Sequence, residues 1–345
     1  MKNIFLTVFA IAAMIFTSCS NKVDLYVDKG DTTVVYAMID AYADTNFFKI
    51  THSFVGNSGE LAQNYEANNY TYDEIEVTFT GVFADSPATQ TITLDTISKW
   101  IPYDPNNIFY NNCWQTYYYT TKKLVEGKEY TLNILRKEDN VNISATTTTI
   151  NSFRYQKPLQ NQPVKFQDVK RYTIEWKVDD ASTMFQTTAA YFTIDTYFNF
   201  RELMPGSTDT THVALRWPVG SDKAENLFTT SNNKSYYTIT YTPEAFYSFL
   251  DNNVYLKENS PSGVQRWFDK FEFRISAVGE ELYNYYIISN STSAIQDVPN
   301  YTNVENGMGI MSSRVSKSSF HTINQIDRMN VQNNYPYGFI YDPNR

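Results

Sequence analysis

The sequence of 345 residues is poor in cysteine, histidine and positive charge, with two cysteines, three histidines and 28 basic against 37 acidic residues. Two cysteines cannot build a disulfide scaffold or a four-cysteine zinc site. A net charge of −9 has the wrong sign for a protein that binds nucleic acid through its phosphates. Gly-x-Ser-x-Gly and His-Glu-x-x-His motifs are also missing. We therefore expect no metal, no cofactor and no enzymatic activity.

Long apolar runs are missing as well, except at the start of the chain. Lys2 precedes an apolar run over residues 4–16, which is the layout of a secretory signal peptide. As a helix this run spans roughly 20 Å, too short for a hydrocarbon core of about 30 Å. We predict that residues 1–18 are a signal peptide.

The segment Phe16-Thr17-Ser18-Cys19 resembles a bacterial lipobox, in which small residues precede a lipidated cysteine. The resemblance implies that Cys19 carries acyl chains that hold the mature protein on a membrane, with residues 19–32 as the lipidated end and tether. Cys113 is then the remaining thiol. A non-lipidated signal peptide is the alternative, and palmitate labelling of a Cys19→Ala variant separates the two.

Aromatic residues are abundant: 28 Tyr, 23 Phe and 5 Trp. Apolar and polar residues alternate in many segments, for example over 172–178, which is typical of strands with one buried face. The first half of the chain contains strand candidates at 33–41, 47–54, 73–83, 89–97, 113–121, 129–136 and 141–148. We predict a mainly β protein whose residues 33–150 form an immunoglobulin- or fibronectin-like sandwich.

The second half, residues 151–345, is predicted to be another β-rich domain with a few short helices, because prolines interrupt the alternation after residue 150. Its strand candidates are 171–178, 189–200, 211–218, 236–241 and 270–278. Helices are expected near 243–255 and 280–288, each with an apolar stripe against a sheet. We also expect a short helix over 59–68, an irregular loop over 101–112 and an extended tail from residue 330.

The segment over 296–314, QDVPNYTNVENGMGIMSSR, resembles the closing motif of a family of Bacteroidota lipoproteins with a domain of unknown function. Residues 35–40 and 48–51 resemble that family's opening strands. The resemblance implies a β-rich, lipid-anchored outer-membrane protein that works beside TonB-dependent uptake systems, and it implies no catalytic residue. The motif also has a plain structural interpretation, since Asn306-Gly307 favours a turn and Gly309 a bulge or a close backbone approach.

The strand over 113–121 is aromatic on both faces, with Tyr117 and Tyr119 on one face and Trp114 and Tyr118 on the other. Either both faces are covered, or one face binds a sugar, a peptide or a membrane partner. The candidates for ligand or partner binding are Trp114, Tyr117, Tyr118, Tyr119, Asn306 and Arg314, the last as a clamp for a carboxylate.

We expect a non-enzymatic accessory or binding protein of the outer membrane. An envelope polysaccharide hydrolase with unidentified carboxylates and an adhesin-like surface module are the alternatives. A deep polar cleft with two facing carboxylates would favour the hydrolase. A broad aromatic patch without such a cleft would favour binding.

Overall fold

The computed structural model describes residues 32–52, 72, 74–102, 113–167, 170–178, 187–232, 234–255, 263–290 and 301–342. The predicted signal peptide (1–18), Cys19, nearly all of the tether, the predicted helix over 59–68 and loop residues 103–112 lie outside the described residues.

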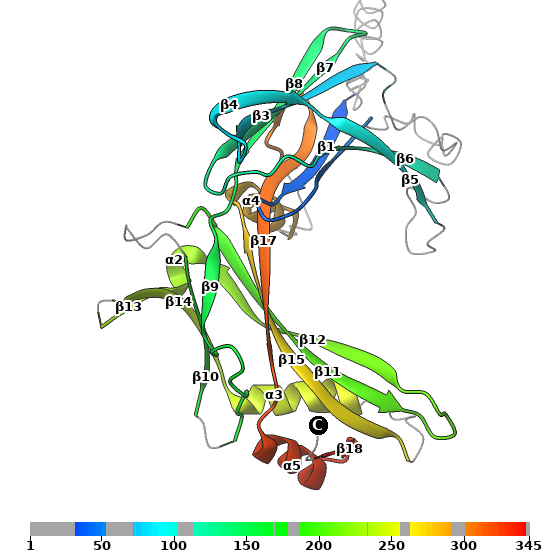
Figure 1. Ribbon diagram of the computed structural model, residues 1–345, viewed down its shortest axis with the longest axis vertical. Coiled ribbons are helices and arrows are strands. Elements are labelled where there is room, and N and C mark those ends of the chain that lie inside the picture. The colour runs from blue at the N-terminus through cyan, green and yellow to red at the C-terminus, as the bar shows by residue number, and fades with distance from the viewer. Residues whose placement is uncertain are drawn as a thin grey trace, which may run out of the picture.

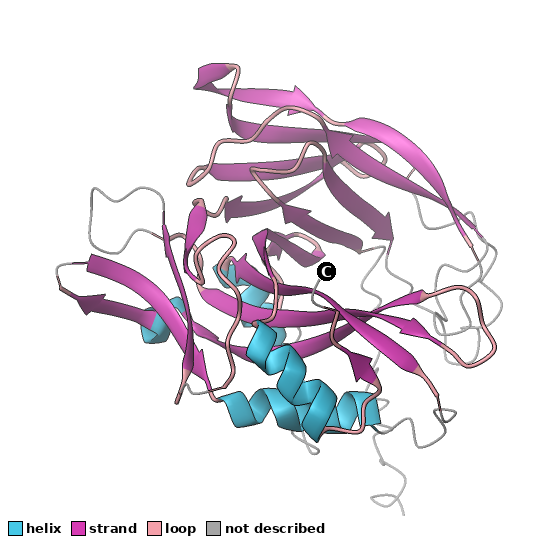
Figure 2. Cartoon of the chain, turned by 60° about the horizontal axis from the view of Figure 1, so that its bottom comes forward, coloured by secondary structure: helices cyan, strands magenta, loops and turns pink. Residues whose placement is uncertain are grey.

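Three sheets make up most of the described chain, so the prediction of a mainly β, sandwich-type fold is confirmed (Figures 1 and 2). The largest sheet contains β1 (Thr33–Ile39), β2 (Asn46–His52), β5 (Asp95–Ile101), β6 (Cys113–Thr120), β11 (Tyr191–Leu203), β12 (Thr211–Lys223), β15 (Gln265–Val278), β17 (Met308–His321) and β18 (Phe339–Ile340). Its order is β12-β11-β15-β17-β1-β2-β6-β5, with β18 beside β15.

Two smaller sheets pack against this large sheet. One contains β3 (Ile75–Phe83), β4 (Ser86–Thr93), β7 (Glu129–Arg136), β8 (Val141–Thr148) and β16 (Val304–Glu305), in the order β16-β8-β7-β3-β4. The other contains β9 (Phe153–Lys157), β10 (Tyr172–Val178), β13 (Phe228–Ser231) and β14 (Lys234–Tyr241), in the order β13-β14-β10-β9.

The first hydrophobic core lies between β1 and β2 on one side and β3, β7 and β8 on the other. Strict alternation supplies it, because every second residue of these strands is buried. Tyr130 is fully buried here, and its hydroxyl donates to Val82 O and accepts from Val125 N at 2.7 Å. We call the part of the chain around this core the first body.

The second core, which defines the second body, lies between the β11–β15–β17 part of the large sheet and the sheet of β9, β10 and β14. Aromatic residues fill it; the rings of Phe166 and Phe246 stack with centroids 3.9 Å apart. At its edge the guanidinium of Arg266 donates to the Glu202 carboxylate at 2.7 Å and to Tyr337 O, and both charged side chains are 4% exposed.

Five short helices complete the fold: α2 (Ala224–Leu227), α3 (Pro243–Leu250), the π-helix η1 (Asp251–Tyr255), α4 (Glu280–Asn290) and α5 (Gln325–Asn334) among the described residues. The predicted helix at 243–255 is confirmed as α3 and η1, and its Phe246, Phe249, Leu250 and Val254 are buried as expected. Helix α4 confirms the second prediction, but its Tyr286 is exposed rather than packed against a sheet.

The strand β17 joins the two bodies, because it pairs in parallel with β1 at its start and antiparallel with β15 along the rest of its length (Figure 1). Gly309 allows the parallel seam to form. Its φ is +104°, and a Cβ atom there would lie 2.0 Å from Val35 O, so the expected close backbone approach is confirmed. Asn306, with φ +56°, occupies the predicted turn before β17.

The domain boundary near residue 150 stays a prediction. The first core takes residues from positions 35–145 together with Val304 and Met311, while the second core takes residues from positions 150–339. The C-terminal half of the chain therefore returns to the first body through β16 and the start of β17.

Several predictions of local structure are wrong. The segment 89–97 is not one strand, since the chain passes from β4 to β5, in a different sheet, at the buried Leu94. The tail from residue 330 is not wholly extended, because α5 reaches Asn334. His321 is buried, and its Nδ1 lies 2.9 Å from Gln162 O and its Nε2 2.7 Å from Ser319 Oγ. Because a carbonyl can only accept, Nδ1 carries the proton.

Candidate functional site

The outer face of the large sheet in the first body carries a group of exposed apolar side chains. They are Tyr36 and Met38 on β1, Phe47 on β2, Ile97 on β5 and Met308 on β17, each between 37% and 45% exposed. We call these five residues the apolar face. Strand pairing brings them together from distant parts of the sequence, since β17, β1, β2, β6 and β5 are consecutive in the sheet.

Half-buried aromatic rings and a lysine extend the apolar face. Tyr119 packs beside Phe47 with ring centroids 6.0 Å apart. The ammonium of Lys99 lies 4.3 Å from the centroid of the Phe47 ring and 5.8 Å from that of Tyr117. A lysine over an aromatic face is attracted by the ring quadrupole, so this contact holds a positive charge beside the rings of Phe47 and Tyr117.

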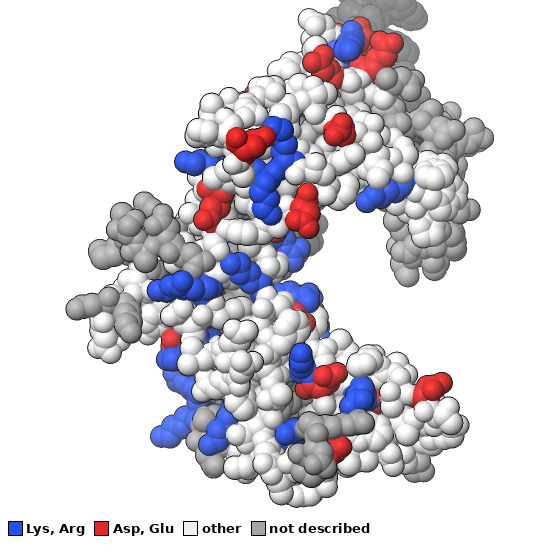
Figure 3. Space-filling model, in the orientation of Figure 1, with Lys and Arg blue, Asp and Glu red and all other residues white. Residues whose placement is uncertain are grey.

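A pair of tryptophans lies on the opposite face of the same strands. Trp100 of β5 and Trp114 of β6 are direct cross-strand partners, and their rings meet edge to face with centroids 5.6 Å apart. Trp100 is 48% exposed and Trp114 is 62% exposed. In Figure 3 the arm of the molecule formed by β5 and β6 shows few charged atoms. We call Trp100 and Trp114 the tryptophan pair.

The predicted candidates on β6 divide between these two surfaces and the core. Tyr118 packs against the first core, where burial raises the pKa of its phenol. Tyr117 and Tyr119 are half-buried at the apolar face, and the Tyr117 hydroxyl donates to Gln115 Oε1 at 3.1 Å. The face of β6 that carries Tyr118 is thus covered at Tyr118 but exposed at Trp114, and the other face is partly open, so the two faces are not both covered.

The remaining candidates lie elsewhere. Asn306 is exposed in its turn, where its amide donates to Asn142 O at 2.9 Å. Arg314 is exposed on β17 opposite Val278. Sequence reasoning missed Trp100, Phe47, Ile97 and Met38, because nothing local in the sequence says which strand faces become neighbours.

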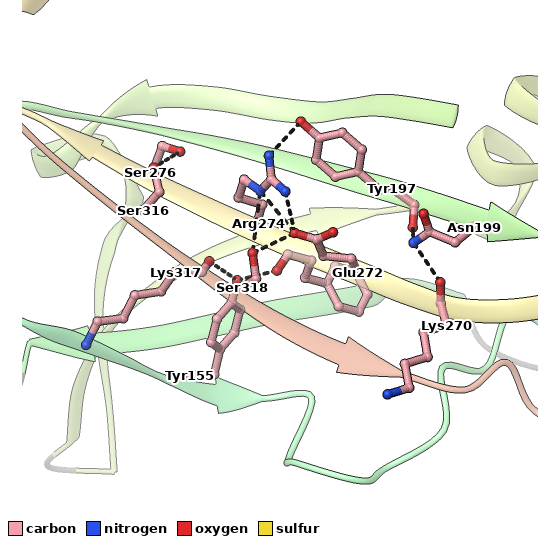
Figure 4. Close-up of polar contacts among 11 residues, drawn as sticks. Tyr155, Tyr197, Asn199, Lys270, Glu272, Arg274, Ser276, Ser316, Lys317 and Ser318 are labelled. Carbon is pink, nitrogen blue, oxygen red and sulfur yellow. Dashed lines mark hydrogen bonds and ion pairs between the residues drawn. The ribbon is translucent and has the colours of Figure 1, made fainter. Parts of the chain in front are cut away.

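A polar network covers the outer face of the second body, where β11, β15 and β17 run side by side (Figure 4). Oε1 of Glu272 accepts from Arg274 Nη2 at 2.8 Å and from Ser318 Oγ at 2.6 Å. Arg274 also donates to the Tyr197 hydroxyl at 3.2 Å. The carboxylate is thus paired with a guanidinium on the sheet surface, and the same holds for Asp195, which accepts from Arg216 at 2.9 Å.

An open pocket of about 390 Å³ lies where α4 meets α2 and the start of β11. Ala189, Ala190 and Ala224 form part of its lining, and charged groups are contributed by Lys223, Glu225 and Glu280. In the part of the chain that the structure describes, no cluster of three or more His, Cys, Asp or Glu side chains could hold a metal ion. None of the helices described is long and apolar enough to cross a bilayer.

The fold and surfaces are those of a two-body β protein with an exposed apolar sheet face. The sequence pattern of the family described as a domain of unknown function, DUF4249, matches residues 21–319. The chain therefore belongs to the DUF4249 family. A comparison with curated proteins finds no match.

Proposed function

We propose that this protein is a lipid-anchored Bacteroidota cell-envelope protein that acts at the outer membrane by binding, without a catalytic step. In this proposal Cys19 carries the lipid, and the apolar face docks onto a TonB-dependent receptor during nutrient uptake. The predicted signal peptide, the lipobox and the resemblance of residues 296–314 support the location. The apolar face supports the mode of action.

The observation that carries the proposal is the contiguity of the apolar face. Exposed apolar residues scattered singly are ordinary, whereas a contiguous set on one sheet face is typical of an interaction site. Here five such side chains lie on consecutive strands of one sheet, with half-buried Tyr117 and Tyr119 between them. A partner that covers them removes apolar area from water at about 25 cal/mol per Å².

The carboxylates weigh against the hydrolase alternative. Glycoside hydrolysis uses two facing carboxyl groups, one of which keeps its proton near neutral pH. Among the described carboxylates, Glu272, Asp195 and Glu202 are paired with arginines. Burial raises the pKa of Asp40 and of Asp327, but Asp40 lies in the first body and Asp327 in α5 of the second. These groups offer no facing pair.

The test is co-purification of the tagged, full-length protein from detergent-solubilised native membranes. We expect a TonB-dependent receptor, identified by mass spectrometry, to be recovered with the wild type. Ile97→Glu places a charge in the apolar face and should reduce that recovery by about tenfold or more. Leu159→Glu is the matched control, because Leu159 is 64% exposed and belongs to the second body.

Recovery of the protein alone from native membranes would overturn the accessory role. Equal receptor recovery with Ile97→Glu and Leu159→Glu would overturn the assignment of the apolar face. Palmitate labelling tests the anchor separately, since Cys19→Ala should abolish both labelling and membrane association. Binding of a host surface or a glycan in place of the receptor would favour the adhesin-like alternative.

A further inference from the structure

We propose that the tryptophan pair inserts into the membrane interface and orients the first body on the bilayer. The proposal rests on the lipid anchor of the proposed function, and it adds a second membrane contact formed by the folded chain itself. The occupant of this surface is the lipid headgroup region.

The tryptophan pair differs from the other tryptophans of the chain. Trp176 is fully buried, Trp217 is 9% exposed and Trp267 is half-buried. Trp100 and Trp114 instead expose about half of their surface or more, at the end of a two-stranded arm. An indole has an apolar body and an N–H donor, so it is most stable where one side is apolar and the other is wet, as at a membrane interface.

The pair lies at the same end of the sheet as the point where the tether enters. Strands β1 and β6 are parallel to each other because both are antiparallel to β2, and Phe48 of β2 pairs with both Ala37 and Tyr118. Counting back four residues from that level gives Thr33 on β1 and Trp114 on β6. The printed pairing of β2 with β6 ends at Phe48 and Tyr118, and in Figure 1 the β5–β6 arm projects from the first body.

The short tether allows the tryptophan pair to reach the bilayer that holds the lipid. Residues 19–31 form a chain of 13 residues between the proposed lipid and the first body. Fully extended, such a chain reaches at most about 45 Å. A lipid on Cys19 therefore keeps this end of the sheet close to the bilayer, and the local concentration of lipid that a short tether creates favours a weak second contact.

The charge of β5 and β6 does not oppose the same arrangement. The protein as a whole carries −9, which repels anionic headgroups. Strands β5 and β6 together carry no net charge, because they include one acid, Asp95, and one base, Lys99. Insertion of the two indoles needs no favourable net charge and depends on apolar burial, for which each tryptophan offers on the order of 150–250 Å².

The experiment uses the mature chain produced without lipid, so that the anchor cannot contribute. Vesicles of phosphatidylethanolamine and phosphatidylglycerol, with brominated phosphatidylcholine as a quencher, are titrated while tryptophan emission and flotation are followed. We expect the emission to shift to the blue and to be quenched, because the other tryptophans are shielded or only half-exposed. Trp100→Ala/Trp114→Ala should lower vesicle association by about tenfold or more.

Phe320→Ala is the matched control, since Phe320 is an aromatic residue of the second body that is 51% exposed. It should bind vesicles like the wild type, and the urea midpoints of all variants should agree because the replaced side chains are exposed. No association of the wild type, or equal association of the double variant, would overturn the proposal. The proposal would also be overturned if the double variant lost receptor recovery while its vesicle association stayed unchanged. That result would indicate that the tryptophan pair binds a protein partner.

Failure here is distinguishable from failure of the proposed function. Palmitate labelling reports on the anchor, and the Ile97→Glu variant reports on the apolar face, which lies on the other side of the sheet from the tryptophan pair. The palmitate-labelling test or the receptor-recovery test can give its expected result even if the unlipidated chain does not bind vesicles.

Discussion

Gly309→Ala tests how the two bodies are joined. Gly309 pairs with Val35 in the parallel seam between β17 and β1, with φ at +104°. A Cβ atom at this position would lie 2.0 Å from Val35 O and 3.0 Å from Val35 N. Both atoms are backbone, so no side-chain rotation relieves the contact, and the strands must separate.

The expected cost has two parts. An L-residue held at this backbone conformation costs about 1–3 kcal/mol. Forcing a methyl group into a packed position costs about 1–3 kcal/mol more. We therefore expect Gly309→Ala to lower the free energy of unfolding by about 2–6 kcal/mol, a large share of the 5–15 kcal/mol typical of a folded domain.

Gly206→Ala separates the two parts. Gly206 also has a positive φ, +80°, but its Cβ would meet nothing within 4 Å. Gly206→Ala should therefore lower the free energy of unfolding by the conformational cost alone, about 1–2 kcal/mol. The difference between the two variants measures the steric demand of the seam.

Urea unfolding of the unlipidated mature chain, followed by far-ultraviolet circular dichroism, gives the free energies. Amide hydrogen exchange in β1 gives a local readout, since opening of the seam should expose those amides first. The reasoning is refuted if Gly309→Ala is no less stable than Gly206→Ala, or if protection of the β1 amides is unchanged.

Three further predictions concern buried polar groups. Arg266→Met leaves Glu202 buried without its partner and should cost about 3–5 kcal/mol, whereas the double variant Arg266→Met/Glu202→Met should cost less; equal losses in urea unfolding would contradict the pairing. Tyr130→Phe leaves the backbone groups that its hydroxyl satisfies unpaired and should cost about 1–3 kcal/mol by the same assay. Burial lowers the pKa of His321 below 6.5, so below about pH 6.5 the unfolded chain binds a proton that the folded chain does not. Stability should be level above that pH and fall as the pH drops further, and His321→Asn should weaken this fall; parallel pH profiles of the urea midpoint would contradict it.

Elements with strict alternation could be predicted from the sequence alone. Strands β7 and β8 match the predicted 129–136 and 141–148 at both ends, because one face of each lies on the first core. Helix α3 was predictable from Thr242 and Pro243 at its start, since proline fits the first helical position.

Strand β17 could not be predicted in the same way. Its sequence carries strong turn signals at its start and is rich in serine along its length, and Ser312 and Ser313 are buried although they are polar. Their hydroxyls are satisfied by groups far away in the sequence, such as Ile39 O, which accepts from Ser313 Oγ at 3.0 Å. A strand whose stability depends on such distant partners leaves little local pattern.

The apolar face could not be predicted from the sequence for a related reason. Tyr36 and Phe47 alternate with buried residues as ordinary outward side chains do, and Ile97 lies on β5, whose residues 95–100 are all exposed. Only the order of strands in the sheet makes the three residues neighbours. Trp100 lay beyond the predicted strand over 89–97, so its pairing with Trp114 was not visible. The sequence does contain a signal, since the two tryptophans flank the predicted loop over 101–112 in the way expected of a hairpin.

The continuity of β17 gives the two proposed contacts a consequence for the second body. The strand passes from the seam with β1 into the sheet with β15. A side chain fastens the junction, since Ser313 Oγ accepts from Ile150 N at 3.2 Å and donates to Ile39 O at 3.0 Å. A bilayer contact at the tryptophan pair and a receptor contact at the apolar face would then fix the second body as well, and its outer face with Glu272 and Arg274 would be held at a constant height above the membrane.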